Sequence, residues 1–191
     1  MFKKILILLI LTFCFLLNLP VPESHADYGL EGTVYLKVNI HYQCNNRDCK
    51  ASYANYTDPG EGHVILPVNT PVEIKKWGRR GFIVINKNNK EKILFEYHAK
   101  RMQMSIQDYL KHITSSSEVS LGKLSKKDKK GIEEGKASKG MTKDGVMMAL
   151  GYPATHKTPS LKSDKWIYWA NRFRTLAVNF DEDGVVTSVV D

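Results

Sequence analysis

Apolar and polar residues alternate along much of the first half of the chain. The alternation is clearest in residues 34–40, 72–75 and 93–97. A period of two places the apolar side chains on one face of a β-strand. Turn-forming residues separate these runs, at 58–60, 67–71, 78–81 and 86–90. The pattern therefore predicts an N-terminal antiparallel β-rich module over residues 27–103, either a meander or a small barrel.

The period changes to that of a helix after Ser105. Ile106, Tyr109, Leu110 and Ile113 recur at spacings of three and four, which places them on one helical face. Ser105 is a suitable N-cap because its hydroxyl accepts from backbone N–H groups of the first turn. Three serines follow the helix at residues 115–117. We expect a helix and linker over residues 104–123.

The last third of the chain predicts two short helices followed by three strands. The run Ser125–Asp128 has the form of a capping box and opens a helix toward Gly135. Thr142 caps a second helix, which ends at Gly151. The expected strands are residues 166–169, 175–180 and 185–190. A glycine-containing turn of four residues joins the last two strands into a hairpin.

The first 26 residues have the order of a secretory signal peptide. Lys3 and Lys4 precede an apolar run over residues 5–19, and Ser24 and Ala26 supply small residues at the cleavage positions. Cleavage after Ala26 would leave residues 27–191 as a soluble mature protein. The alternative is an uncleaved membrane anchor, although a span usually needs about 20 apolar residues. We therefore expect a periplasmic or secreted protein.

Cysteine usage changes once the signal peptide is removed. Cys14 lies in the apolar run, so Cys44 and Cys49 are the two cysteines of the mature protein. An even number of cysteines in an exported protein indicates a disulfide, here one that closes a tight loop. The alternative is a zinc site in which His41 and His63 join the two cysteines as ligands.

Positive charge is concentrated in one window of the chain. The 191 residues contain 28 Lys and Arg against 20 Asp and Glu, a net charge of +8, and the mature protein would retain +7. Residues 123–143 contain eight lysines and three acidic residues, and so supply +5 of this charge. The candidate basic patch comprises Lys126, Lys127, Lys129 and Lys130.

Such a patch on an exported protein is suited to an anionic lipid, lipopolysaccharide or an acidic protein. Nucleic acid is not an expected partner outside the cytoplasm. The alternative is a solvated helix face that keeps the protein soluble.

A set of glycine, aromatic and cap residues recurs in a distinctive order through residues 124–191. The set comprises Gly140, Met141, Thr142, Gly151, Pro153, Trp166, Tyr168, Phe180 and Gly184. In this order and spacing, the segment resembles the BamE (SmpA/OmlA) domain family. The resemblance implies two helices packed on a three-stranded antiparallel sheet, a scaffold shared with β-lactamase-inhibitor-like proteins. It also implies binding without catalysis. Gly145 departs from the family pattern, which usually has an acidic residue at this third helical position.

Known catalytic signatures are not found in the sequence. It contains no His-Glu-x-x-His pair, no Gly-x-Ser-x-Gly and no glycine-rich phosphate loop, and we expect no cofactor. The sequence therefore predicts an α+β, exported, non-enzymatic binding or scaffold protein of the cell envelope. The expectation includes a protein partner and peripheral association with the outer membrane.

Two other function classes are kept as alternatives. In the first, the protein is an inhibitor that docks an enzyme through its C-terminal sheet. In the second, it is an enzyme or metal-dependent sensor built around His41, Cys44, Cys49 and His63.

Overall fold

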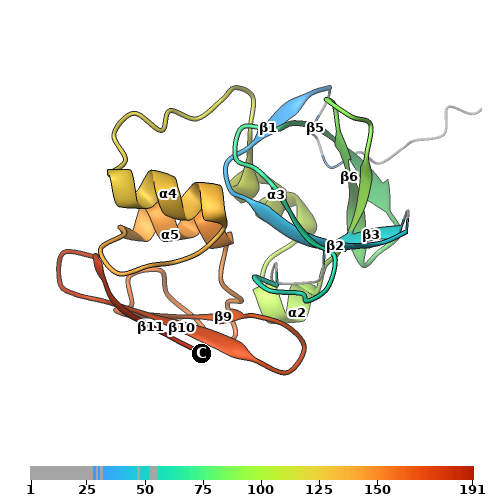
Figure 1. Cartoon of the computed structure of the whole chain (residues 1–191). Coiled ribbons are helices and arrows are strands. Elements are labelled where there is room, and N and C mark those ends of the chain that lie inside the picture. The colour runs from blue at the N-terminus through green and yellow to red at the C-terminus, as the bar shows by residue number, and fades with distance from the viewer. Residues whose placement is uncertain (1–27, 29, 31, 47, 52–55) are drawn as a thin grey trace, which may run out of the picture.

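The computed structural model describes residues 28, 30, 32–46, 48–51 and 56–191. The predicted signal peptide and its cleavage site lie outside the described residues. The fold is α+β, and it consists of a curled eight-stranded sheet, here called the half-barrel, and a C-terminal layer of two helices on a three-stranded sheet (Figure 1). The half-barrel strands are β1 (Val34–Leu36), β2 (Ile40–Asn45), β3 (Asp48–Ala51), β4 (His63–Leu66), β5 (Pro71–Trp77), β6 (Gly81–Asn86), β7 (Lys92–Glu96) and β8 (Thr114–Ser115).

The half-barrel sheet is mixed, with the strand order β4-β2-β3-β7-β6-β5-β1-β8. The prediction of a purely antiparallel module is wrong at one pair, because β3 and β7 run parallel, with Cys49 opposite Ile93. The hairpin with β2 determines the direction of β3, and in that direction β3 lies parallel to β7. The turn residues near β3 do not indicate that its second partner is β7, because β7 is far away in the sequence. Among the described residues, β4 and β8 form the two edges of the sheet and do not pair with each other, so these strands form a half-barrel.

Helix α3 (Ile106–Ile113) fills the concave side of the half-barrel. The hydroxyl of Ser105 accepts from the backbone N–H of Asp108, which confirms the predicted cap. Tyr109 packs against the rings of Phe82 and Phe95, with centroid distances of 6.4 and 5.7 Å. Burying one such side chain contributes roughly 2–3 kcal/mol. A shorter helix, α2 (Ala99–Met102), connects β7 to α3.

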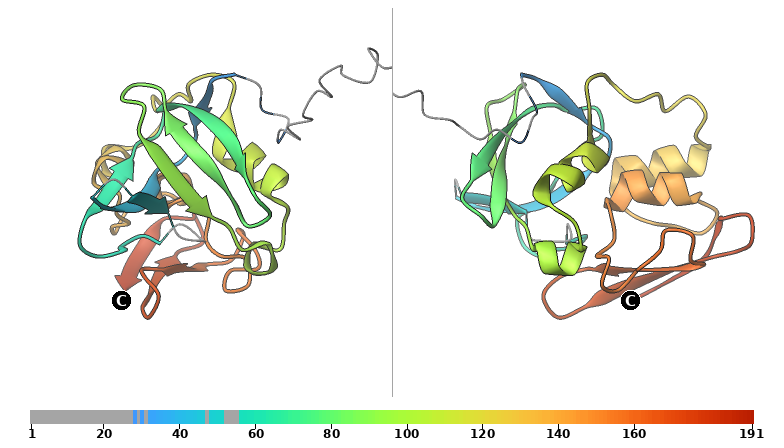
Figure 2. Two further views of the ribbon diagram at one scale, coloured as in Figure 1. Left: turned by 90° about the vertical axis from the view of Figure 1, so that its right-hand side faces the viewer. Right: turned by 180° about the vertical axis from the view of Figure 1, so that it is seen from behind.

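The C-terminal layer matches its predicted elements closely. Helices α4 (Lys126–Glu134) and α5 (Lys143–Leu150) pack together and lie on the sheet β11-β10-β9, as the two views in Figure 2 also show. The strands are β9 (Lys165–Trp169), β10 (Thr175–Phe180) and β11 (Val186–Val190), and all pairs are antiparallel. Alternate residues of the strands point inward to form a core with both helices.

A single buried carboxylate caps both helices of this layer. Asp128 is 0% exposed, and it forms the capping box of α4 with Ser125. Its Oδ1 also accepts from the backbone N–H of Thr142, 2.7 Å away, at the start of α5. A Cβ at Gly145 would overlap Oδ1 of Asp128. Asp128 of α4 therefore accepts the hydrogen bond that an acidic residue at position 145 would accept in a capping box of α5. Its carboxylate fits there because Gly145 has no side chain.

Candidate functional site

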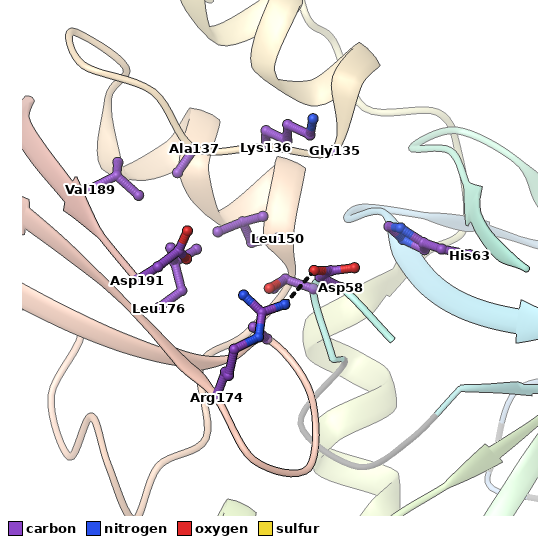
Figure 3. Close-up of a pocket in the computed structure, with 12 residues that line it drawn as sticks. Asp58, His63, Gly135, Lys136, Ala137, Leu150, Arg174, Leu176, Val189 and Asp191 are labelled. Carbon is purple, nitrogen blue, oxygen red and sulfur yellow. Dashed lines mark hydrogen bonds and ion pairs between the residues drawn. The ribbon is translucent and has the colours of Figure 1, made fainter. Parts of the chain in front are cut away.

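The strongest candidate site is a cleft of about 450 Å³ between the half-barrel and the C-terminal layer (Figure 3). Its lining comprises Thr57, Asp58, His63, Gly135, Lys136, Ala137, Leu150, Ala170, Arg174, Leu176, Val189 and Asp191. Charged and polar side chains come from both parts of the molecule, while Leu150, Leu176 and Val189 give the cleft an apolar wall. Clefts of this size between two packed parts of a protein are common ligand and partner sites.

Two histidines connect the cleft to the interior. His41, on β2, is 0% exposed, and its Nε2 lies 2.8 Å from the carbonyl oxygen of Ala149 on α5. Its Nδ1 lies 3.0 Å from Nε2 of His63, on β4. Because a carbonyl only accepts, Nε2–H of His41 donates to Ala149, and Nδ1 of the neutral ring accepts from Nε2–H of His63. The carbonyl oxygen of Ala149 thus determines that Nε2 carries the proton in both neutral rings.

Burial determines the charge of this histidine pair. It lowers the pKa of His41 to about 4, against the opposing effect of its hydrogen bond to Ala149. The pKa of His63 is also lowered, mainly by burial, and the negative charge of Asp58 opposes that shift. Both rings are therefore neutral at pH 7, and Nδ1 of His63 is the nitrogen that is placed to take up a proton first.

An ion pair crosses the cleft. Nη2 of Arg174, from the loop between β9 and β10, lies 2.7 Å from Oδ2 of Asp58 (Figure 3). The backbone N–H groups of Thr57 and Asp58 also donate to the carbonyl oxygens of Trp169 and Ala170, at 3.0 and 2.8 Å. Both charged side chains are about half exposed, so the ion pair itself contributes little stability. Its main effect is to orient the guanidinium at the edge of the cleft.

A buried asparagine joins the two parts behind the cleft. The side-chain amide of Asn39 donates to the carbonyl oxygens of Ile132 and Ala149, at 2.7 and 3.2 Å. Its Oδ1 accepts from the backbone N–H of Val68 at 2.9 Å. The sequence pattern placed Asn39 among the polar positions of an alternating run, yet it is 0% exposed. The sequence feature that could have indicated its burial is an uncharged amide between two apolar residues, Val38 and Ile40, at the point where the run divides into β1 and β2.

The disulfide predicted between Cys44 and Cys49 is present in the structure, with an S–S distance of 2.00 Å. The two cysteines lie opposite each other across the β2–β3 hairpin. Both sulfur atoms are consumed by this bond, so they do not join His41 and His63 in the four-ligand zinc set. Among the described residues, the potential ligand atoms that gather with the two sulfurs are those of Glu91.

The predicted basic patch is exposed on α4. Lys126, Lys127, Lys129 and Lys130 all face solvent, and Lys130 lies 3.7 Å from Glu134 one turn further along the helix. These four lysines do not line the cleft. The lysine that does is Lys136, which follows the end of α4.

The residues that carry the family resemblance occupy structural positions. Met141, Trp166, Tyr168 and Phe180 are buried in the C-terminal core. Thr142 caps α5 by accepting from the backbone N–H of Gly145. Gly140, Gly151 and Gly184 have positive φ angles of 88°, 77° and 75°, which only glycine adopts at low cost, and Pro153 follows α5 in a buried position.

No protein-family model matches the chain, and no curated protein or solved structure matches it either. Within the part of the chain that the structure describes, no helix has the length and apolar character needed to cross a membrane. Support for a function therefore comes from the residues and contacts of this chain.

Proposed function

We propose that the protein is an exported, non-enzymatic binding or scaffold protein of the cell envelope, with a BamE (SmpA/OmlA)-like domain in residues 124–191. Its proposed role is in outer-membrane assembly or integrity. The observation that carries the proposal is the agreement between the resemblance and the C-terminal layer. Two capped helices lie on a three-stranded antiparallel sheet, and Trp166, Tyr168 and Phe180 fill the core between them.

The cleft supports binding more readily than catalysis. His41 is the most strongly perturbed histidine, and its two ring nitrogens are hydrogen-bonded to Ala149 and His63. Such a group orients its neighbours and holds the two parts together. The remaining polar side chains form a mixed-charge edge around an apolar wall, an arrangement suited to recognising a partner through shape and charge.

Export is supported by the leader-like sequence and by the disulfide. Lys3 and Lys4, the apolar run and Ala26 have the order that signal peptidase requires. The Cys44–Cys49 bond is of a kind that persists in oxidising compartments such as the periplasm. A protein partner in the envelope is the first expectation, while the α4 lysines are the proposed contact for anionic lipid or lipopolysaccharide. Nucleic acid is not a proposed partner.

Fractionation of cells producing the full chain tests this function. We expect a processed protein in the periplasmic or membrane fraction, with Asp27 as its first residue by N-terminal sequencing. Chemical cross-linking in intact cells should then yield a specific complex with an envelope protein. A chain that remains unprocessed in the cytoplasm, or one that cross-links only to cytoplasmic proteins, would contradict the proposal.

A second candidate function is inhibition of an enzyme through the C-terminal sheet. The face turned away from the helices carries a cross-strand row of Ile167, Ala177 and Val190, and Val190 is 54% exposed. An apolar row of this kind suits a flat protein interface. If this candidate is correct, Ala177→Arg should abolish binding to the target enzyme while Thr187→Arg, at an exposed position on β11, leaves it intact.

A further inference from the structure

The most exposed large apolar side chain among the described residues is Phe173. It is 85% exposed and lies in the loop that connects β9 to β10. In Figure 1 this hairpin extends beneath the half-barrel, and hydrogen bonds from Thr57 and Asp58 to Trp169 and Ala170 fix its base there. Phe173 therefore stands at the boundary between the two parts, and it contributes little to the core of either.

The loop that presents Phe173 is held in one conformation. Oδ1 of Asn171 accepts from the backbone N–H groups of Phe173 and Arg174, at 3.0 and 3.1 Å. The backbone N–H of Ala170 donates to the carbonyl oxygen of Arg174 at 2.9 Å, and the Arg174 side chain pairs with Asp58. A side chain on a loop already ordered in this way loses little further conformational entropy when it is bound.

A basic groove of about 460 Å³ lies beside Phe173. Its lining comprises Gln43, Lys50, Tyr56, Pro59, Asn171, Arg172 and Phe173. This described lining contains two cationic side chains and no acidic one. Lys50 and Arg172 come from different parts of the molecule, the half-barrel and the C-terminal layer, so the groove depends on their packing.

The disulfide holds one wall of this groove. Gln43 and Lys50 are cross-strand partners in the β2–β3 hairpin, and the adjacent pair along the hairpin is Cys44 and Cys49. Because side chains alternate between the faces of a strand, the disulfide lies on the opposite face from Gln43 and Lys50. It therefore fixes the separation of the two strands without occupying the groove.

We propose that Phe173 and the basic groove form a docking site for a protein partner that presents an apolar pocket edged by aspartate or glutamate side chains. The inference rests on the proposed binding function and names a surface for it. The exposed ring supplies an apolar anchor, while Lys50 and Arg172 supply charge complementary to an acidic edge. A protein fits better than a membrane, because protruding side chains can enter a groove of about 460 Å³ and a flat lipid surface cannot.

Site-specific photo-cross-linking of the full chain in intact cells tests the docking site. A benzophenone amino acid is placed at position 173 or, for comparison, at Trp77, an exposed aromatic residue at the end of β5. We expect a discrete protein adduct from position 173, whose cross-linked peptide, mapped by mass spectrometry, contains Asp or Glu beside apolar residues. Position 77 should not give this adduct.

Charge reversal separates this site from a general effect of net charge. Lys50→Glu combined with Arg172→Glu should lower the adduct yield roughly tenfold or more, because two attractive contacts become repulsive. Lys76→Glu combined with Lys123→Glu makes the same change in net charge at two exposed lysines outside the groove and outside the α4 patch, and it should leave the yield unchanged. Thermal unfolding of both double variants checks that each remains folded.

Several outcomes would overturn the docking site. These are the absence of an adduct from position 173, an adduct with lipid, a mapped peptide without acidic residues, and a yield that responds equally to both double variants. If the protein is exported and forms its envelope complex while position 173 captures nothing, the docking site is wrong and the proposed function stands. A chain that is not exported removes the proposed function itself.

Discussion

The half-barrel and the C-terminal layer achieve stability by different means. The half-barrel contains the hairpins β2–β3, β5–β6 and β6–β7, but β1 also pairs with β5 and β8, and β3 with β7, so several neighbouring strands are far apart in the sequence. The C-terminal layer is built from neighbours in sequence, because α4 packs on α5 and β10 pairs with β9 and β11. The half-barrel therefore depends in part on long-range pairing and a disulfide, whereas the C-terminal layer is held mainly by contacts between elements that follow one another in the sequence.

This difference predicts which changes destabilise each part. Local contacts form without closing long loops, so loss of a cap should affect the C-terminal layer directly. The stability of the half-barrel should depend more on covalent constraints on the chain, such as the disulfide. Residues at the junction should affect both parts at once.

The largest effect is expected in the C-terminal layer, from Asp128→Ala. The substitution removes the carboxylate that accepts from the backbone N–H groups of Ser125 and Thr142, and it leaves these partly buried donors without that partner. We expect the free energy of unfolding to fall by about 4 kcal/mol in urea titrations. Asp144→Ala, which removes an exposed acidic residue from the first turn of α5, is the matched control and should cost less than about 1 kcal/mol. Equal losses from the two variants would mean that Asp128 is not the shared cap.

A smaller effect, on both parts together, is expected from Asn39→Ala. The variant loses the side-chain hydrogen bonds to Ile132, Ala149 and Val68 at the junction, and we expect a loss of about 3 kcal/mol in unfolding free energy. Amide hydrogen exchange read by mass spectrometry should show faster exchange in both β2 and α5. The exposed Asn88 provides a control, since Asn88→Ala should change neither. Faster exchange confined to β2 would argue against coupling through Asn39.

Reduction of the disulfide should destabilise the half-barrel selectively. Opening the short loop between Cys44 and Cys49 increases the entropy of the unfolded chain, and we expect a loss of about 2 kcal/mol. Hydrogen exchange should accelerate in β2 and β3 and remain unchanged in α4 and α5. The double variant Cys44→Ser/Cys49→Ser, compared with and without reductant, shows whether the reductant acts elsewhere. Acceleration in the C-terminal helices would mean that the two parts do not differ as proposed.

The smallest effect is a pH dependence that originates at the junction. The folded-state pKa of His41, about 4, lies below its ordinary value of 6.5, so the unfolded chain takes up a proton first as the pH falls. This contribution to stability is fully present above pH 6.5 and is lost as the pH falls through about 4. Between pH 7.5 and 5.5 we expect a loss of about 1 kcal/mol. In urea titrations at each pH, His41→Gln should flatten this slope, whereas Asn88→Ala, a change at an exposed residue without a titratable group, should leave it intact.

The C-terminal layer was the more predictable part because its signals are local. Ser125, Thr142 and Gly151 mark helix ends through contacts within a few residues, and the structure confirms these ends. The alternation in residues 93–97 likewise gave the buried Ile93 and Phe95 of β7 correctly. The parallel β3–β7 pair was missed, because no turn or period encodes a partner more than forty residues away.

The candidate site was only partly predictable for the same reason. His41, His63 and the two cysteines were identified as residues with chemical potential, but the structure pairs the histidines with each other and the cysteines in a disulfide. Asp58 and Arg174 lie 116 residues apart, and nothing local indicates that they meet. The alternating pattern predicted that Asn39 faces solvent, whereas in the structure it is buried and its side chain donates to Ala149 of α5.

The shared carboxylate of Asp128 has a consequence for the order in which the molecule folds. The capping box of α4 is internal, whereas the first turn of α5 is completed only when α4 is present, because the N–H of Thr142 bonds to Asp128 of α4. Short helices of this length are marginal by themselves in water. Helix α5 should therefore not form ahead of α4, and no state in which α5 alone is intact should accumulate.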